Sequence, residues 1–192
     1  MKKIALLMLA LVLVLSLVAC GGKPVDNSDN STGGNNNSTN TDDGDTDTEK
    51  LTMSITLAEG WREVETSNDS KQYNPPEEVI ERDPFVYLRL TVEDNYRNYG
   101  EREYVEQRLD KEKIAFDTDD YDYSDITELT IGGHRAFEFT RTNKKEVGGE
   151  RTRQTFIVKG EYVYCVVVEA SKKEWNSLLA DFDFMRDSLT LT

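Results

Sequence analysis

A Ser-His-Asp or Cys-His catalytic arrangement in this 192-residue chain would have to use its single histidine, His134. A serine or cysteine nucleophile needs a base within hydrogen-bond reach and a third group that orients this base. His134 directly follows a Gly-Gly turn, and the chain contains no Gly-x-Ser-x-Gly elbow. We therefore expect a surface or packing role for His134 and predict no catalytic residue.

Cys165 has none of the surroundings of a reactive thiol. It lies within an apolar run from Tyr162 to Val168, whereas a reactive thiolate needs a cationic or helix-terminal neighbourhood. The run favours a buried strand, with Cys165 as an inert core residue. One such cysteine and one histidine also provide too few ligands for a zinc site.

An acidic segment between residues 117 and 128 has a partial similarity to a calcium-binding loop. Four carboxylates match positions one, three, nine and twelve of the EF-hand template: Asp117, Asp119, Asp125 and Glu128. Position five is Tyr121, and position six, where the template needs glycine, is Asp122. We keep the four carboxylates as candidate metal ligands but predict a solvated acidic loop, with no bound metal and no cofactor.

Carboxylates and tyrosines are abundant enough to suggest two further kinds of site. With 37 Asp and Glu residues, a carboxylate pair of the glycosidase type is inevitable, so its presence alone carries no weight. Tyr87, Tyr162 and Tyr164 are expected to share one face of a sheet. Exposed aromatic rings beside polar groups suit a glycan or a peptide, and packing of a half-covered sheet is the alternative interpretation.

The charge of the chain argues against partners that need a basic surface. The 37 acidic residues oppose 23 Lys and Arg, which gives a formal net charge of −14 at pH 7. Nucleic-acid binding needs a basic face that replaces phosphate counterions, and anionic lipid needs a polybasic patch. We expect neither role and interpret the acidity as a contribution to solubility.

The first twenty residues have the pattern of a removable targeting segment. Lys2 and Lys3 precede an apolar stretch from Ile4 to Val18, which ends in Leu17-Val18-Ala19-Cys20. The stretch is shorter than the roughly 20 apolar residues that span a bilayer, although an uncleaved anchor is the alternative. The segment resembles a bacterial lipoprotein signal peptide. This resemblance implies cleavage before Cys20, a diacylglycerol on its sulfur, and a lipid-anchored protein on the extracytoplasmic face of the cell membrane.

Composition divides the chain into three parts: a signal peptide at 1–19, a lipid-anchored linker at 20–50 and a folded domain at 51–192. The linker consists mainly of Asn, Ser, Thr, Asp and Gly, and Val25 is its only aliphatic residue. Such a segment buries too little apolar surface to offset the entropy of ordering, so we predict disorder. The 142 residues from 51 to 192 suffice for one domain.

Apolar periodicity predicts an α+β domain. Alternation predicts strands at residues 53–57, 61–66, 85–93, 126–131, 134–142, 151–158 and 161–169. Spacings of three and four predict helices at 101–116, with residues 114–116 on the apolar side, and from Trp175 to Leu189. Residues 67–83, with the Pro75-Pro76 pair, are expected to be mostly loop. Glycine-containing turns join the last four strands, so we predict an antiparallel sheet of about six to seven strands packed by an early and a C-terminal helix.

Short sequences at turns and strand starts add a second resemblance. They are Gly60-Trp61, Ile131-Gly132-Gly133-His134-Arg135-Ala136, Gly160-Glu161-Tyr162-Val163-Tyr164 and Asp187-Ser188-Leu189. With the order of elements, they resemble the PsbP-like superfamily over nearly all of residues 51–192. The resemblance implies an α/β/α sandwich that serves as a binding or assembly module, as in photosystem accessory subunits and bacterial lipoproteins of this superfamily. It implies no catalytic motif.

Two functional hypotheses follow. The first, which we favour, is a non-catalytic binding or accessory module at the cell surface that engages an envelope protein, a peptide or a glycan. The second is an extracytoplasmic hydrolase that uses carboxylates or a metal held by residues 117–128. An enzyme predicts a concave pocket with convergent carboxylates of perturbed pKa, whereas a binding module predicts a flat or grooved surface with exposed aromatic residues.

Overall fold

The computed structural model describes residues 49–67, 69–145 and 147–192. The predicted signal peptide, Cys20 and the linker up to residue 48 lie outside these ranges. Within the ranges, no helix combines the length and the apolar character needed to cross a membrane.

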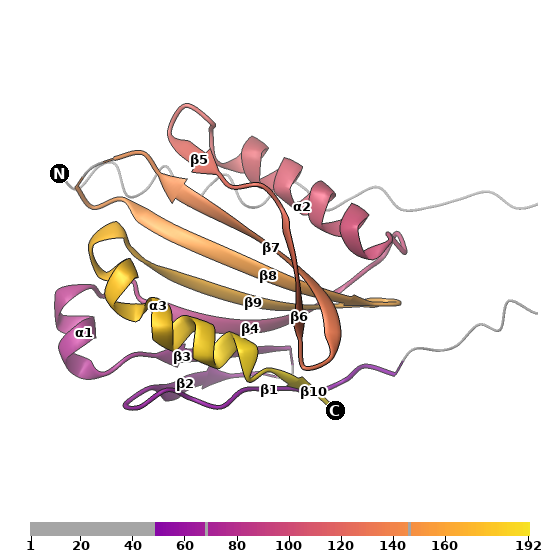
Figure 1. Ribbon diagram of the computed structural model, residues 1–192, viewed down its shortest axis with the longest axis horizontal. Helices are drawn as coiled ribbons and strands as arrows, with labels where there is room; N and C mark the ends of the chain where they lie inside the picture. Colours follow the sequence, from indigo (N-terminus) through magenta and orange to yellow (C-terminus); the bar gives the residue numbers. More distant parts are fainter. Residues whose placement is uncertain (1–48, 68, 146) are drawn as a thin grey trace, which may run out of the picture. The chain divides into compact units, whose positions relative to one another are not determined.

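Eight strands form one antiparallel sheet in the order β2-β3-β4-β9-β8-β7-β5, and β6 pairs separately with β7 (Figure 1). They are β2 (Arg62–Thr66), β3 (Ser70–Asn74), β4 (Tyr87–Asp94), β5 (Tyr121–Tyr123), β6 (Thr127–Ile131), β7 (His134–Asn143), β8 (Glu150–Lys159) and β9 (Tyr162–Ser171). A second sheet pairs β1 (Met53–Ser54) with β10 (Thr190–Leu191). The predicted hairpin turns are present, and Gly132, Gly133 and Gly160 adopt positive φ angles of 55°, 80° and 54°.

Strand β9 shows why the sequence has a continuous apolar run at residues 162–168. The strand lies between β4 and β8, and both of its faces are covered. Val163 and Cys165 pack into one apolar cluster, whereas Tyr164 and Val166 pack into the other, on the opposite face. A strand that is buried on both sides needs apolar residues at consecutive positions.

Helix α3 (Lys172–Asp187) covers one face of the sheet. Its predicted apolar stripe is confirmed: Trp175, Leu178, Phe182 and Met185 are buried in the larger of the two clusters. The Ser171 hydroxyl caps the helix by accepting the Glu174 backbone N–H over 3.3 Å. Trp61 packs edge-on against Phe182 with ring centroids 5.7 Å apart.

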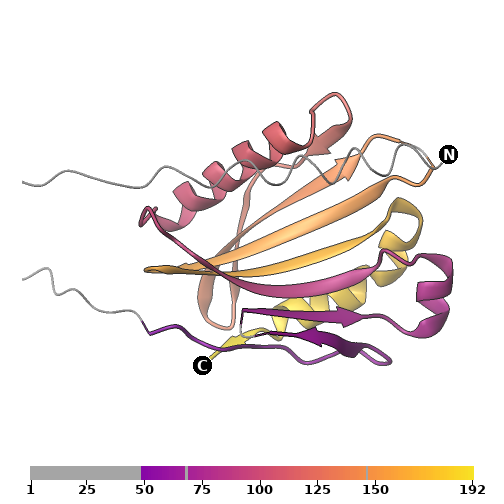
Figure 2. The ribbon, with the colours of Figure 1, turned by 180° about the vertical axis from the view of Figure 1, so that it is seen from behind.

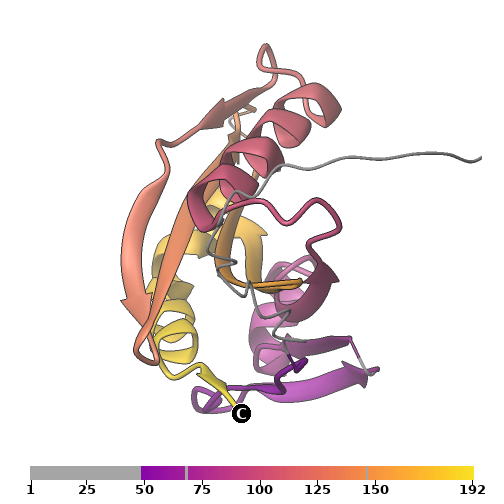
Figure 3. The same ribbon diagram turned by 90° about the vertical axis from the view of Figure 1, so that its right-hand side faces the viewer.

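Helix α2 (Glu101–Ala115) lies on the opposite face, against β7 and β8 (Figure 3). Val105 and Leu109 pack against an apolar patch of the sheet. This patch consists of Phe137, Phe139, Phe156, Val158, Val163 and Cys165. The molecule therefore has the predicted sheet between two helices, with eight strands in the main sheet.

Residues 67–83 differ from the predicted loop, because they contain strand β3 and helix α1 (Glu77–Arg82). Strand β3 buries Tyr73 alone, and helix α1 buries Val79 alone. A single buried residue does not produce a repeating apolar pattern, so the sequence pattern could not reveal either the strand or the helix. The Pro75-Pro76 pair separates them, and Pro76 occupies the N-cap position of α1.

Three smaller expectations also need correction. The strand predicted at 53–57 is only the two residues of β1, and the acidic loop contains strand β5. Ile114 does not belong to the apolar side of α2, since its side chain is 86% exposed. At about 100° per residue, Ile114 lies roughly 140° around the helix from Leu109 and so points to solvent.

Candidate functional site

Helix α2 covers only part of its face of the sheet. Figure 2 shows this face, where no helix of the described ranges lies over β4 and β3. Residues Tyr87, Arg89, Thr91 and Glu93 of β4 alternate with the buried Leu88 and Leu90, so they face the same side as α2. The result is a polar groove between the flank of α2 and strand β4, which we call the α2 groove.

Two hollows lie at the end of this groove, where β4 leads into α2, and Tyr96 lines both. The larger has a volume of about 490 Å³ and the smaller about 270 Å³. The larger hollow is within the ~300–1,000 Å³ of ordinary small-molecule sites. Both are lined by Asp94, Asn95 and Tyr96. We call the two hollows and their lining the Tyr96 corner.

The loop that presents Tyr96 is held by one buried side chain, Asn95, which is 2% exposed. Its Nδ2 donates to the carbonyls of Tyr99 and Gly160 over 2.9 and 3.0 Å, and its Oδ1 accepts the Tyr99 N–H over 3.0 Å. Asn98 follows in the left-handed region with φ of 49°, where asparagine is tolerated. The loop thus has a fixed shape while Tyr96 itself is 89% exposed.

Charged groups in the larger hollow are linked to one another. Glu93 accepts hydrogen bonds from the Tyr104 hydroxyl over 2.9 Å and from Arg108 over 3.2 Å. Burial, followed by the charge of Glu93, raises the pKa of Tyr104, so this hydroxyl stays a donor. Lys50 is paired with Asp69, and its Nζ lies 5.7 Å from the centre of the Tyr162 ring.

Tyr96 and Tyr99 also have polar contacts at their hydroxyl ends. Arg97 donates from Nη1 to the Tyr99 hydroxyl over 3.1 Å. A hydrogen bond to Asp94 raises the pKa of the Tyr96 hydroxyl. Tyr99 and Tyr104 are thus held by hydrogen bonds at their hydroxyl ends, and the exposed Tyr96 ring is available for contact.

The α2 groove continues past Arg108 to a further hollow of about 250 Å³. There Arg141 donates to Glu112 over 2.6 Å and to Thr152 over 3.1 Å, and Thr152 donates to Glu169 over 2.9 Å. The Nε atoms of Arg108 and Arg141 are buried, and neither has a hydrogen-bond partner among the described residues. Arginines thus contact the carboxylates along the groove wall, an arrangement that fixes the wall's shape.

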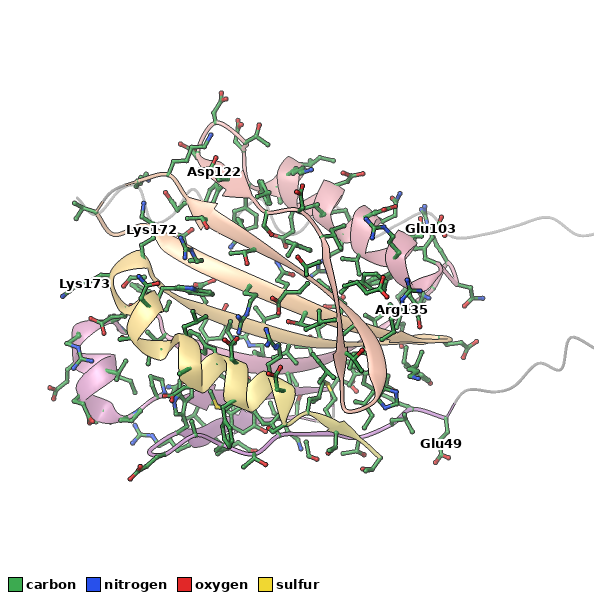
Figure 4. All side chains as sticks on the ribbon, viewed as in Figure 1. Glu49, Glu103, Asp122, Arg135, Lys172 and Lys173 are labelled. Carbon is green, nitrogen blue, oxygen red and sulfur yellow. The ribbon has the colours of Figure 1, made fainter. Side chains whose placement is uncertain are left out.

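The four candidate metal ligands do not converge. Asp117 Oδ1 accepts the Asp119 N–H over 2.9 Å, and Asp125 is exposed. Glu128 lies on β6, where Arg135 binds both of its oxygens over 2.7 and 2.8 Å and holds the pKa of its carboxyl below the usual value. In the part of the chain that the structure describes, no three His, Cys, Asp or Glu residues are placed to hold a metal ion. Figure 4 shows Asp122 of the same segment well apart from Arg135.

The tyrosine prediction was wrong for Tyr87. Directly paired residues share a face of the sheet, and Tyr87 pairs with Glu169. Residue 169 is an odd number of positions from Tyr162 and Tyr164, so these two lie on the other face. Tyr164 is fully buried, and its hydroxyl accepts the Leu51 N–H over 2.8 Å. Of the three predicted tyrosines only Tyr162 lines the corner, together with Tyr96, Tyr99 and Tyr104. The signal for Tyr96 and Tyr99 is the sequence Asn-Tyr-Arg-Asn-Tyr-Gly between a strand and a helix.

Cys165 and His134 occupy unreactive surroundings. Cys165 is a buried core residue, as predicted, and burial raises the pKa of its thiol. His134 begins β7 and is partly buried, and burial together with the charge of Lys159 lowers its pKa.

No protein-family model matches the chain, and no curated protein matches its sequence. Solved structures nevertheless resemble it. LpqN, which is involved in cell envelope biogenesis of Mycobacterium tuberculosis, is 16% identical and superimposes with a TM-score of 0.54 over 74% of this chain and 84% of LpqN. Cyanobacterial PsbP from Synechocystis sp. PCC 6803 is 11% identical, with a TM-score of 0.51 over 78% of this chain and 96% of that protein. At such identities the likeness lies in the fold, and the chain has the PsbP-like α+β fold that its sequence predicts.

Proposed function

We propose that the protein is an extracytoplasmic lipoprotein, anchored through Cys20, that acts as a non-catalytic binding or accessory module of the cell envelope. We propose the Tyr96 corner as its recognition surface. In this proposal residues 1–19 are removed, residues 20–50 are the tether, and residues 51–192 are the binding domain. The fold shared with LpqN, a protein of envelope biogenesis, supports the setting.

One observation carries the choice of surface: Tyr96 is 89% exposed on a loop that the buried Asn95 fixes. A large aromatic side chain gains most from contact when its position is set before the ligand arrives, because less conformational entropy is then lost on binding. Tyrosine also combines an apolar ring with a polar tip. An exposed tyrosine on a rigid loop, which lines two polar hollows, has the properties of a binding anchor.

The position of the tether supports the same surface. Glu49 and Lys50 begin the described domain, and Lys50 lines the larger hollow of the corner. Figure 4 marks Glu49 at the edge of the domain. The tether would therefore join the domain beside the recognition surface. Its 31 residues would reach about 100 Å when fully extended, which is enough to place the corner well away from the lipid headgroups.

Binding is also better supported than hydrolysis. In the candidate metal segment, Asp117 accepts the Asp119 N–H and Glu128 binds Arg135, so the two carboxylates have separate partners. In the groove, Glu93 and Glu112 are each bound by an arginine. A hydrolase of the glycosidase type needs one carboxylic acid as proton donor and one carboxylate on the far side of the bond. Carboxylates fixed by arginine serve instead to orient the wall of a binding groove.

The test is retention on isolated cell envelopes. The lipid-free Cys20→Ala chain is mixed with envelopes and sedimented, with Tyr96→Ala as the diagnostic variant and Phe85→Ala as its control. Phe85 is also an exposed aromatic residue, at 71%, but it lies in the loop before β4 and outside the corner. We expect Tyr96→Ala to lower the bound fraction about tenfold and Phe85→Ala to leave it unchanged. Equal retention of all three proteins would show that the corner is not the recognition surface.

The anchor is tested separately. Chains with Cys20 and with Cys20→Ala are compared in the membrane fraction and by thermal unfolding, and both carry Tyr96→Ala so that the corner does not hold them on the envelope. We expect the Cys20 replacement to release the protein from the membrane without changing the unfolding temperature, because a tether of this composition is expected to add few contacts to the domain. Persistence of the Cys20→Ala chain in the membrane fraction would contradict the proposed lipid anchor.

A further inference from the structure

We infer that the ligand of the Tyr96 corner is a neutral glycan. This inference rests on the proposed function, since it names the chemistry of the ligand for the same surface. Three features of the corner carry it: a balance of charge, an exposed aromatic ring that lines both polar hollows, and the small number of contacts offered to a peptide.

The charge balance of the corner differs from that of the rest of the protein. Four cations line the two hollows, namely Lys50, Arg97, Arg108 and Lys111, and four carboxylates oppose them, namely Asp69, Glu93, Asp94 and Glu161. The whole chain, in contrast, has 37 acidic and 23 basic residues. A charged ligand selects a surface of the opposite sign. A corner without net charge, in an acidic protein, therefore favours a neutral ligand.

Sugar hydroxyls match this mixture of groups. A hydroxyl both donates and accepts hydrogen bonds, so it can donate to carboxylates such as Asp94 and Glu161 and accept from cations such as Lys111. A sugar ring also has an apolar face of C–H groups, which suits contact with an aromatic ring. Tyr96 offers that ring at the border of the two hollows. A glycan that occupies either hollow could therefore contact Tyr96.

A peptide lacks its usual modes of recognition here. Strand β4 pairs with β9 along its whole length and with β3 over residues 88–91, so only its last residues leave a short edge for an added strand. A peptide side chain would need an apolar pocket, and Val92 is the one aliphatic side chain among the described residues that line the hollows. Both observations favour a hydroxyl-rich ligand.

The experiment treats the isolated envelopes before the retention assay with the lipid-free Cys20→Ala chain. One portion is digested with protease, and another is oxidised with periodate, which cleaves the vicinal diols of sugars. We expect protease to leave retention unchanged and periodate to reduce it at least tenfold. Tyr96→Phe, which keeps the ring, should retain within about threefold of the parent chain, whereas Tyr96→Ala should lose about tenfold.

Salt separates a neutral glycan from a charged one. Contacts with a charged polymer weaken steeply as the ionic strength rises, whereas contacts with neutral hydroxyls do not. We expect retention in high salt, for example about 0.5 M NaCl, to stay within twofold of that in low salt.

The outcomes distinguish this inference from the proposed function. Retention that depends on Tyr96 but is abolished by protease and not by periodate would overturn the glycan and leave a binding module for an envelope protein. Loss of retention in high salt would overturn a neutral ligand. Retention that does not depend on Tyr96 would overturn both the inference and the proposed recognition surface.

Discussion

Arg141 on β7 donates to Glu112 on α2 over 2.6 Å, and this ion pair fastens the last turn of α2 to the sheet. The two side chains are only 8% and 12% exposed. The Arg141 guanidinium also lies 3.6 Å from the centre of the Phe116 ring, directly after the helix. One arginine thus fixes α2, which forms one wall of the α2 groove, to strand β7.

Glu112→Gln should destabilise the protein by about 3 kcal/mol, because it leaves the charge of Arg141 buried without its partner. The control is Glu106→Gln on the same helix. Glu106 also pairs with an arginine, Arg102, over 2.9 Å, but both side chains are more than half exposed. An exposed pair contributes about 0.5 kcal/mol or less. Urea unfolding of both variants measures the difference, and similar losses would show that burial of the Arg141 pair has no special importance.

The turn between β6 and β7 offers a second matched comparison. Gly132 and Gly133 both have positive φ, so alanine is strained at either position. A Cβ at Gly132 would in addition lie 2.6 Å from the carbonyl oxygen of Leu189, whereas a Cβ at Gly133 would meet nothing within 4 Å. We expect about 1 kcal/mol of destabilisation for Gly133→Ala and clearly more for Gly132→Ala. Equal unfolding temperatures of the two variants would contradict the contact between this turn and the C-terminal segment.

Sequence patterns predicted the strands and helices whose apolar side chains repeat. Strands β4 and β7 and helices α2 and α3 bury residues at regular spacing, and strands β8 and β9 bury runs of consecutive residues. Both patterns are visible in the sequence, so these elements could be located. Strand β3 was missed because one face packs only Tyr73 and the other faces the open groove. Strand β3 is stabilised by backbone pairing with β4, and this pairing does not require a pattern of apolar residues in the sequence.

The candidate site was less predictable than the fold, because it combines segments that are distant in the chain. Lys50, Asp94, Lys111 and Glu161 meet only after β4 and β9 have paired. Whether two tyrosines share a face also depends on the register between strands, which is why Tyr87 was placed wrongly. The loop sequence around Tyr96 is a local signal of a possible site. It supports a binding role only together with the exposure of the Tyr96 side chain in the folded chain.

Asn95→Ala should loosen the loop that presents Tyr96. The replacement removes three hydrogen bonds of a buried side chain and leaves the carbonyls of Tyr99 and Gly160 without these donors. We expect a loss of about 1–3 kcal/mol of stability, faster amide exchange in residues 95–99 and weaker retention on envelopes.

Asn143→Ala is the control, because Asn143 is also a buried asparagine but lies outside the corner. Its Nδ2 donates to Glu150 over 3.1 Å, and its Oδ1 accepts the Lys145 N–H over 2.9 Å. We expect a loss of stability similar to that of Asn95→Ala, but retention close to that of the parent chain. If Asn95→Ala retained as well as Asn143→Ala, a fixed Tyr96 would not be needed for binding.

The free energy of unfolding should depend on pH through the ionisation of one residue, His134. Burial, followed by the charge of Lys159, lowers the pKa of His134 below its ordinary value of 6.5. The unfolded chain therefore takes up this proton at a higher pH than the folded protein does. As the pH falls through 6.5 towards the lower folded pKa, the unfolded state binds more protons, and the free energy of unfolding decreases.

The chain has one histidine, and carboxylates titrate near pH 4, so between about pH 5.5 and 7 this decrease reports His134. His134→Asn should flatten the dependence of stability on pH in that window. The imidazole resonance in NMR spectra of the folded protein should titrate with a midpoint below 6.5, and Lys159→Gln should move the midpoint upward because a repelling charge is removed. A midpoint at or above 6.5 would mean that the imidazole is solvated in the folded protein, and the packing of His134 at the start of β7 would then have to be reconsidered.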